Sequence, residues 1–155
     1  MRPGVRLGVD VGRVRIGLAR SDLHGMLAMP VETVARGDGD LARIMAEAAE
    51  SAAIEIVVGL PLSMSGAVTA STEDATLFAR RLAAASAVPV RMVDERLSTV
   101  SAQRALHQQG RSTRRSRPVI DQVAAVIILQ HALDLERSGD FPPGVVVDPH
   151  EGLDP

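Results

Sequence analysis

The stretch that decides the fold is LGVDVGRVRIGLA, residues 7–19. Apolar residues alternate with small or charged residues on both sides of a turn that contains Gly12. Strict alternation around such a turn predicts a β-hairpin. Asp10 lies where the first strand ends, so the sheet holds its carboxylate at the border of the core. That position suits a metal ligand, but an aspartate beside a turn can also simply bond the backbone.

The composition excludes several classes of protein. The 155 residues include no Cys, no Lys, no Trp and no Tyr, and 46% are hydrophobic. The chain therefore has no disulfide framework, no thiolate zinc site, no cysteine nucleophile and no lysine Schiff base. Aromatic platforms for stacked bases are nearly absent. Without a long apolar run or a signal-peptide core, we expect a cytoplasmic protein that does not bind membranes.

The remaining pattern predicts one α/β domain over residues 1–137, followed by an acidic, flexible tail over 138–155. We expect a five-stranded mixed sheet flanked by helices, whose first three strands form an antiparallel meander. A capping box of Ser71 and Asp74 is expected to begin the second helix. The further strands are expected at 26–34, 54–60 and 88–93, and the helices at 41–53, from Ser71 onward, 98–109 and 119–135.

Four carboxylates stand at positions that suit chemistry. Asp10 ends the first strand, Asp94 and Glu95 end the last, and Asp121 lies in the first turn of an apolar helix. The carboxyl ends of parallel strands share one edge, so Asp10 and Glu95 can converge there, with Asp121 in reach. Clustered carboxylates need a cation, and hard oxygen ligands favour Mg²⁺ or Mn²⁺. Alternatively, Asp121 only complements the helix dipole. Asp94 and Glu95 could likewise be solvated loop residues that form ion pairs with Arg96.

Basic residues suggest a polyanionic partner. Residues 138–155 hold four acids and no Arg, so the rest of the chain has 17 basic and 15 acidic residues. Four of these arginines fall within seven residues, which favours a phosphate-binding loop over an ordinary solvated one. The candidate nucleic-acid contacts are Arg13, Arg96, Arg111, Arg114, Arg115 and Arg117, with Ser63 and Ser65 as further candidates.

The sequence resembles the YqgF/RuvX family of pre-16S rRNA nucleases, which are related to Holliday junction resolvases and have an RNase H-like fold. The resemblance covers residues 7–135. It rests on four segments in order: GVDVGRVRIGLARSD at 8–22, VVGLPLSMSG at 57–66, VDERLSTVSAQRAL at 93–106 and IDQVAAVIILQ at 120–130.

The resemblance implies a divalent-metal nuclease site. Its first-strand aspartate is Asp10, the glutamate of its Asp-Glu-Arg motif is Glu95, and the aspartate of its last helix is Asp121. Asp94 is a further candidate ligand. Resolvases of the wider superfamily have an acidic residue at the end of the fourth strand, where this chain has Gly59-Leu60-Pro61.

The leading functional hypothesis is a metal-dependent endonuclease that processes the 5′ end of pre-16S rRNA, with ribosomal precursor particles as partners. The alternative is a Holliday junction resolvase that acts on branched DNA as a homodimer. A non-catalytic nucleic-acid-binding assembly factor ranks third. A kinase-like ATPase is disfavoured because the chain is too short for a second lobe and has no further Gly-rich phosphate loop.

Overall fold

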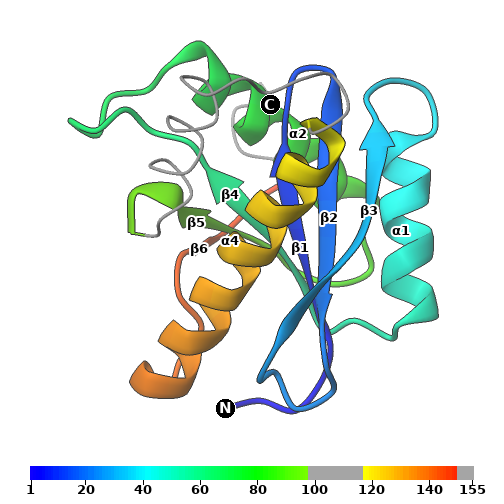
Figure 1. Cartoon of the computed structure of the whole chain (residues 1–155), viewed down its shortest axis with the longest axis vertical. Coiled ribbons are helices and arrows are strands. Elements are labelled where there is room, and N and C mark those ends of the chain that lie inside the picture. Colours follow the sequence, from blue (N-terminus) through cyan, green and yellow to red (C-terminus); the bar gives the residue numbers. More distant parts are fainter. Residues whose placement is uncertain (98–116, 150–155) are drawn as a thin grey trace.

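The computed structural model describes residues 1–97 and 117–149, with the backbone alone for 97 and 117–121. A mixed sheet of order β3-β2-β1-β4-β5-β6 separates helices α1 and α2 from helix α4 (Figure 1). The elements are β1 (Arg6–Val11), β2 (Arg15–Ser21), β3 (Ala28–Ala35), α1 (Asp40–Glu50), β4 (Glu55–Leu60), α2 (Ala70–Ala85), β5 (Val90–Asp94), the 3₁₀ turn η1 (Glu95–Leu97), α4 (Arg117–Gly139) and β6 (Val145–Val146).

The first three strands form the expected antiparallel meander, and β1, β4 and β5 are parallel neighbours. Proline cannot donate to a ladder, and Pro30 indeed lies in β3, which is an edge strand. The carboxyl ends of β1, β4 and β5 therefore lie at one edge, as the sequence predicted.

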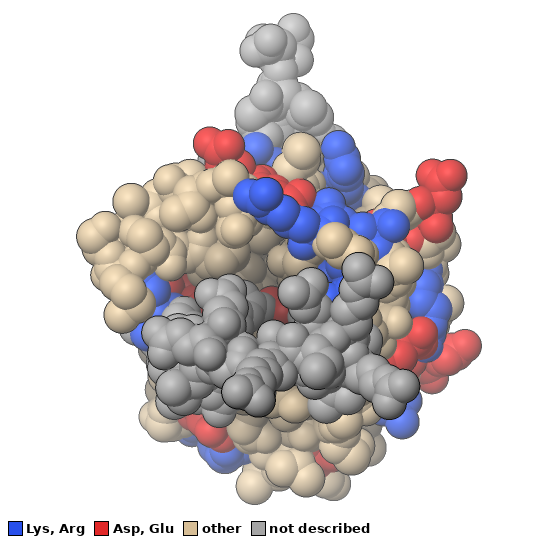
Figure 2. Space-filling model, turned by 45° about the horizontal axis from the view of Figure 1, so that its top comes forward, with Lys and Arg blue, Asp and Glu red and all other residues tan. Residues whose placement is uncertain are grey.

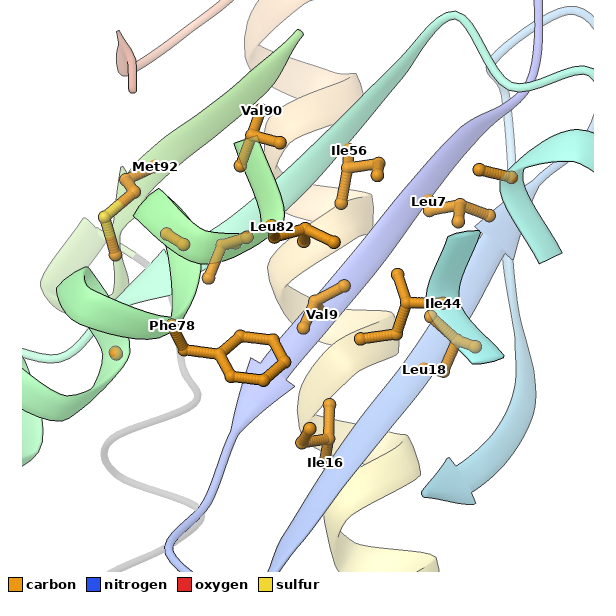
Figure 3. Packing of buried hydrophobic residues seen from close by; sticks show 14 of the residues in the cluster. Leu7, Val9, Ile16, Leu18, Ile44, Ile56, Phe78, Leu82, Val90 and Met92 are labelled. Carbon is orange, nitrogen blue, oxygen red and sulfur yellow. The ribbon is translucent and has the colours of Figure 1, made fainter. Parts of the chain in front are cut away.

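Two hydrophobic clusters hold the layers together. The first lies between the sheet and helices α1 and α2, where Leu7 and Val9 meet Ile44, Phe78 and Leu82 (Figure 3). The second joins the other face of the sheet to α4 and includes Val57, Val93, Ala125 and Leu129. Because side chains alternate along a strand, β1 sends Leu7 and Val9 to the first cluster and its intervening residues toward α4.

Among the described residues, the sheet has six strands rather than the expected five. The sixth, β6, comes from the segment expected to be a tail, and Val145 and Val146 pair antiparallel with β5. Gly144 allows this approach, since a Cβ there would clash with the Met92 carbonyl oxygen and the glycine has φ +80°. The division into a domain at 1–137 and a tail stays a prediction.

The predicted cap of α2 is wrong. Thr69 is the N-cap residue: its hydroxyl accepts from the Thr72 N–H at 3.3 Å, and the Thr72 hydroxyl accepts from the Thr69 N–H at 3.0 Å. The helix therefore begins at Ala70, so Ser71 falls inside it. Asp74 instead binds Arg36 through two hydrogen bonds.

Within the described parts of the chain, no helix has both the length and the apolar character that crossing a membrane requires. The helix expected at 98–109 lies outside the described residues.

Candidate active site

The α4-facing side of β1 fixes how the helix lies on the sheet. Near the start of the strand, buried Arg6 donates from Nη2 to Oε2 of Glu136 at 2.8 Å. Two residues later, a Cβ on Gly8 would lie 2.7 Å from Cβ of Leu129 and 3.0 Å from the Ala125 carbonyl oxygen. As β1 runs forward, its contacts move backward along α4. The helix is therefore antiparallel to β1 and packs closely on it, which the missing side chain of Gly8 makes possible.

This register extends to Asp10, the next α4-facing residue of β1. The step from Gly8 to Asp10 is about 6.6 Å along a strand, and the step from Ala125 to Asp121 is about 6 Å along a helix. The backbone thus places residue 121 of α4 level with Asp10. Asp10 itself is only 2% exposed. The side chain of Asp121 lies outside the described part of the structure.

Glu95 reaches the same edge from β5. It follows the strand directly, in η1, and is only 4% exposed. β4 lies between β1 and β5, and its Gly59 carries no side chain. A Cβ there would lie 2.6 Å from Oε1 of Glu95 and 2.7 Å from Cδ1 of Ile128 in α4. The Glu95 carboxylate therefore fills the space over Gly59, on the α4 side, so two buried acids lie at the carboxyl ends of strands that flank β4.

Asp94 has a different environment. Its carboxylate accepts from Nε of Arg96 at 3.1 and 3.2 Å, from Nη2 at 2.7 Å and from the Arg96 N–H at 2.9 Å. Hydrogen bonding to the Arg96 side chain lowers the pKa of Asp94 below its usual value. Asp94 and Arg96 thus form the ion pair that the sequence left open as an alternative.

Arg96 also adjoins the loop that contains Ser63 and Ser65. A Cβ on Gly66 would lie 2.9 Å from Nη1 of Arg96. The two serine hydroxyls are 3.0 Å apart, and the Ser63 hydroxyl accepts from the Ala67 N–H at 2.9 Å. The loop is therefore held by its own hydrogen bonds, and its exposed hydroxyls lie near the Asp94–Arg96 pair.

Several predicted site residues lie outside what the structure describes. Arg111, Arg114 and Arg115 fall in the interval 98–116, and of Arg117 only the backbone at the start of α4 is described. Among the described side chains, no group of three His, Asp or Glu residues could hold a metal ion. A group of three ligands would therefore need at least one side chain beyond those described, and Asp121 is the predicted one.

Arg13 lies exposed in the turn between β1 and β2, close to this edge. Figure 2, which brings this end of the sheet forward, shows arginine side chains gathered beside a hollow in which acidic atoms are visible. Sequence reasoning missed three residues near Arg13, which are Arg36, Asp74 and Arg81. They belong to separate elements, so no spacing in the sequence relates them to the turn.

Comparison with known proteins identifies the family. Residues 4–135 match the RuvX family, which is described as Holliday junction resolvase. The chain belongs to the RuvX family. A RuvX relative from Clavibacter michiganensis subsp. michiganensis (strain NCPPB 382), named "Putative pre-16S rRNA nuclease", is 63% identical over all of this chain and 98% of its own length. A relative of the same name from Leifsonia xyli subsp. xyli (strain CTCB07) is 58% identical over 98% of this chain and 99% of its own length.

Solved structures confirm the fold expected for a RuvX protein. The Thermus thermophilus RuvC structure in complex with a Holliday junction substrate aligns with a TM-score of 0.54 and 18% identity, over 90% of this chain and 99% of that one. This likeness establishes a RuvC-type, RNase H-like architecture. Family membership and fold together place the chain among the nucleases.

Proposed function

We propose that this chain is a divalent-metal-dependent endonuclease that processes the 5′ end of pre-16S rRNA. The observation that carries the proposal is the burial of two carboxylates, Asp10 and Glu95, at the ends of strands on either side of Gly59. Carboxylate oxygens are the donors that hard divalent cations prefer, so two carboxylates held at one edge of the sheet support a cation site there.

The donor set fits Mg²⁺ or Mn²⁺. Carboxylate oxygens are the ligands these ions prefer, and the chain has no Cys that would favour a softer metal. Asp10, Glu95 and Asp121 would hold the ion. Asp94 fits this role less well because its carboxylate is bound to Arg96. A divalent cation bound there supplies Lewis-acid chemistry, which activates water and neutralises charge on the phosphate.

The chain's own residues bind and orient the substrate. The sheet and α4 fix the two buried carboxylates, which keeps the reacting phosphate in one position. Arg13 and the arginines at 111–117 bind phosphates of the substrate, and Ser63 and Ser65 donate hydrogen bonds to the strand. Arg96, anchored by Asp94, presents its guanidinium beside the same loop.

The choice of precursor rRNA follows the relatives. Two proteins at 58% and 63% identity over nearly the whole chain carry a pre-16S rRNA nuclease name. At that similarity the substrate class is expected to be shared. The function also implies a cytoplasmic location and ribosomal precursor particles as partners.

The test uses Asp10→Asn, which keeps the side-chain volume but removes the negative charge. We expect this variant to bind precursor rRNA and to lose cleavage with Mg²⁺ or Mn²⁺. Asp134→Asn, a half-exposed acid that pairs with Arg137 on α4, is the matched control and should cleave normally. Equal cleavage by Asp10→Asn and the unaltered protein would refute the proposal. Binding without cleavage by the unaltered protein would instead support an assembly factor.

Junction resolution is the second candidate, and the description of the matched family favours it. It requires a homodimer that cuts two strands symmetrically. Against it, resolvases of the wider superfamily have an acid at the end of the fourth strand, where this chain has Gly59-Leu60-Pro61 and Glu95 fills the space over Gly59. Competition between a four-way DNA junction and precursor rRNA at one salt concentration decides between the two substrates.

A further inference from the structure

A pocket of about 420 Å³ lies at the same end of the sheet as the candidate active site, but on the side of α1 and α2. Its wall combines one turn, one loop and two helices, all outside the acidic site. The lining includes three arginines, two aspartates and one aromatic ring: Arg13, Arg36, Arg81, Asp38, Asp40 and Phe78.

Arg36 holds the walls of this pocket together. It donates from Nη1 to the Gly12 carbonyl oxygen at 2.7 Å and binds Asp74 of α2 through both Nη atoms, at 2.9 and 3.0 Å. Its guanidinium lies over the Phe78 ring, 5.2 Å from the centroid. The turn between β1 and β2 is thereby tied to α2, so the pocket is formed before any ligand binds.

The other two arginines are available to a ligand. Arg13 and Arg81 are exposed, and within the described residues neither makes a hydrogen bond or an ion pair. Both lie close to Asp74: the hydrogen bond from Arg36 lowers the pKa of Asp74 most, and the charges of Arg13 and Arg81 lower it further. Two arginines with no hydrogen bond or ion pair among the described residues thus converge on one pocket, and guanidinium groups favour anions such as phosphate.

The two aspartates make the pocket selective for more than a bare anion. Asp40 Oδ2 accepts from the Gly37 N–H at 3.0 Å, which fixes this carboxylate at the start of α1. Asp38 is exposed beside it. Carboxylates accept hydrogen bonds from hydroxyl and amino groups. A nucleotide carries both features, namely a phosphate for the arginines and hydroxyl or amino donors for the aspartates.

The pocket is within reach of a strand bound at the acidic site. Arg13 follows Asp10 by three residues, so their Cα atoms are at most about 11 Å apart. At the 3.4 Å spacing of a stacked strand, a separation of that size corresponds to at most about three nucleotides. We propose that the pocket lined by Arg13, Arg81, Asp38 and Asp40 is a subsite for one nucleotide of the substrate strand, within about three positions of the scissile bond. This inference rests on the proposed nuclease function.

The test compares two neighbouring arginines of α2. Arg81→Gln removes a pocket cation, and Arg80→Gln makes the same change at a residue that does not line the pocket. Binding of single-stranded precursor RNA is measured with chelator present, so cleavage plays no part. A lost phosphate contact lowers the slope of log K against log salt by about 0.7 for a single strand. We expect that change, with about fivefold weaker binding, for Arg81→Gln only.

The outcomes separate this inference from the proposed function. Equal slopes for the two variants would overturn the subsite while leaving the nuclease proposal intact. Absence of RNA binding by the unaltered protein would overturn both. Adenosine monophosphate and inorganic phosphate serve as free probes. If either binds in an Arg81-dependent way while RNA binding is unchanged by Arg81→Gln, the pocket takes a free anion and the substrate-strand subsite is wrong.

Discussion

Gly59→Ala tests whether the position of the Glu95 carboxylate matters for cleavage. The added Cβ would lie 2.6 Å from Oε1 of Glu95 and 2.7 Å from Cδ1 of Ile128, whereas ordinary contact begins at 3.4 Å. The carboxylate must therefore withdraw by about 0.8 Å and the Ile128 methyl by about 0.7 Å. Both movements occur at the floor of the candidate site.

The two movements have different consequences. Inserting a methyl group into a packed core costs about 1–3 kcal/mol of stability, which leaves a stable domain folded. A misplacement of about 1 Å in a catalytic group can cost on the order of 100-fold in rate. We therefore expect Gly59→Ala to be folded, moderately destabilised and about 100-fold slower in cleaving precursor rRNA. Mn²⁺ affinity measured by calorimetry should fall with it.

The double variant Gly59→Ala/Ile128→Val separates packing from the site. Valine lacks the δ carbon, so the clash with α4 is removed while the clash with Glu95 stays. Stability measured by urea unfolding should partly recover relative to Gly59→Ala, and cleavage should not. A folded Gly59→Ala protein with normal cleavage would show that the reaction does not depend on where Glu95 lies.

Two further predictions concern stability. Burial opposes ionisation of Glu136, but hydrogen bonds from Arg2 and the nearby arginine charges lower its pKa from 4.5 to about 2. The carboxylate therefore contributes fully to the free energy of unfolding above pH 4.5, and this contribution is lost as the pH falls toward 2. In Glu136→Gln, the free energy of unfolding measured with urea should depend less on pH in that window. The variant should also lose about 3–5 kcal/mol at pH 7, because Arg6 stays buried without this partner. The same dependence on pH in the variant and the unaltered protein would contradict this. Thr69→Ala should cost about 1 kcal/mol in thermal unfolding and Ser71→Ala under about 0.5, and the reverse order would contradict the assigned cap.

The strands were predictable because their side chains alternate or form short apolar runs. The hairpin of β1 and β2 has a clear period of two, and β4 is a continuous buried run, as expected for a strand covered on both faces. Strand β6 gave no such signal. It has only two residues, Val145 and Val146, and both are exposed, so its pairing depends on β5 and on the close approach of Gly144. Such a strand is formed by tertiary contact alone.

The cap of α2 shows a second limit of sequence patterns. Both Thr69 and Ser71 can cap a helix, and each is followed three residues later by a side chain that can bond back. Which residue caps the helix depends on Asp74. The spacing in the sequence predicts that Asp74 bonds back to Ser71, whereas in the structure it binds Arg36. That ion pair joins residues 38 positions apart, so local spacing could not reveal it.

The candidate site was predictable in part for a related reason. Topology alone brings the ends of β1 and β5 to one edge, so Asp10 and Glu95 followed from the order of elements. The role of Gly59 could not be predicted in this way, because the role of a residue without a side chain depends on the neighbours that surround it in the fold. Glu95 fills the volume that a side chain on β4 would occupy at this position.

The α4-facing side of β1 shows how one strand serves both stability and function. Three residues face α4 in turn: Arg6 is a buried basic residue, Gly8 is the point of close contact with the helix, and Asp10 is a buried acid. At the amino end of the strand, the acids Glu136 and Glu55 form ion pairs with Arg2, Arg6 and Arg91, so each of these two buried acids has a basic partner within the protein. The tight contact at Gly8 fixes α4 between the two ends. A helix anchored in this way by its far end holds its backbone at residue 121 beside Asp10, and such support from packed elements is what a precise binding or catalytic site requires.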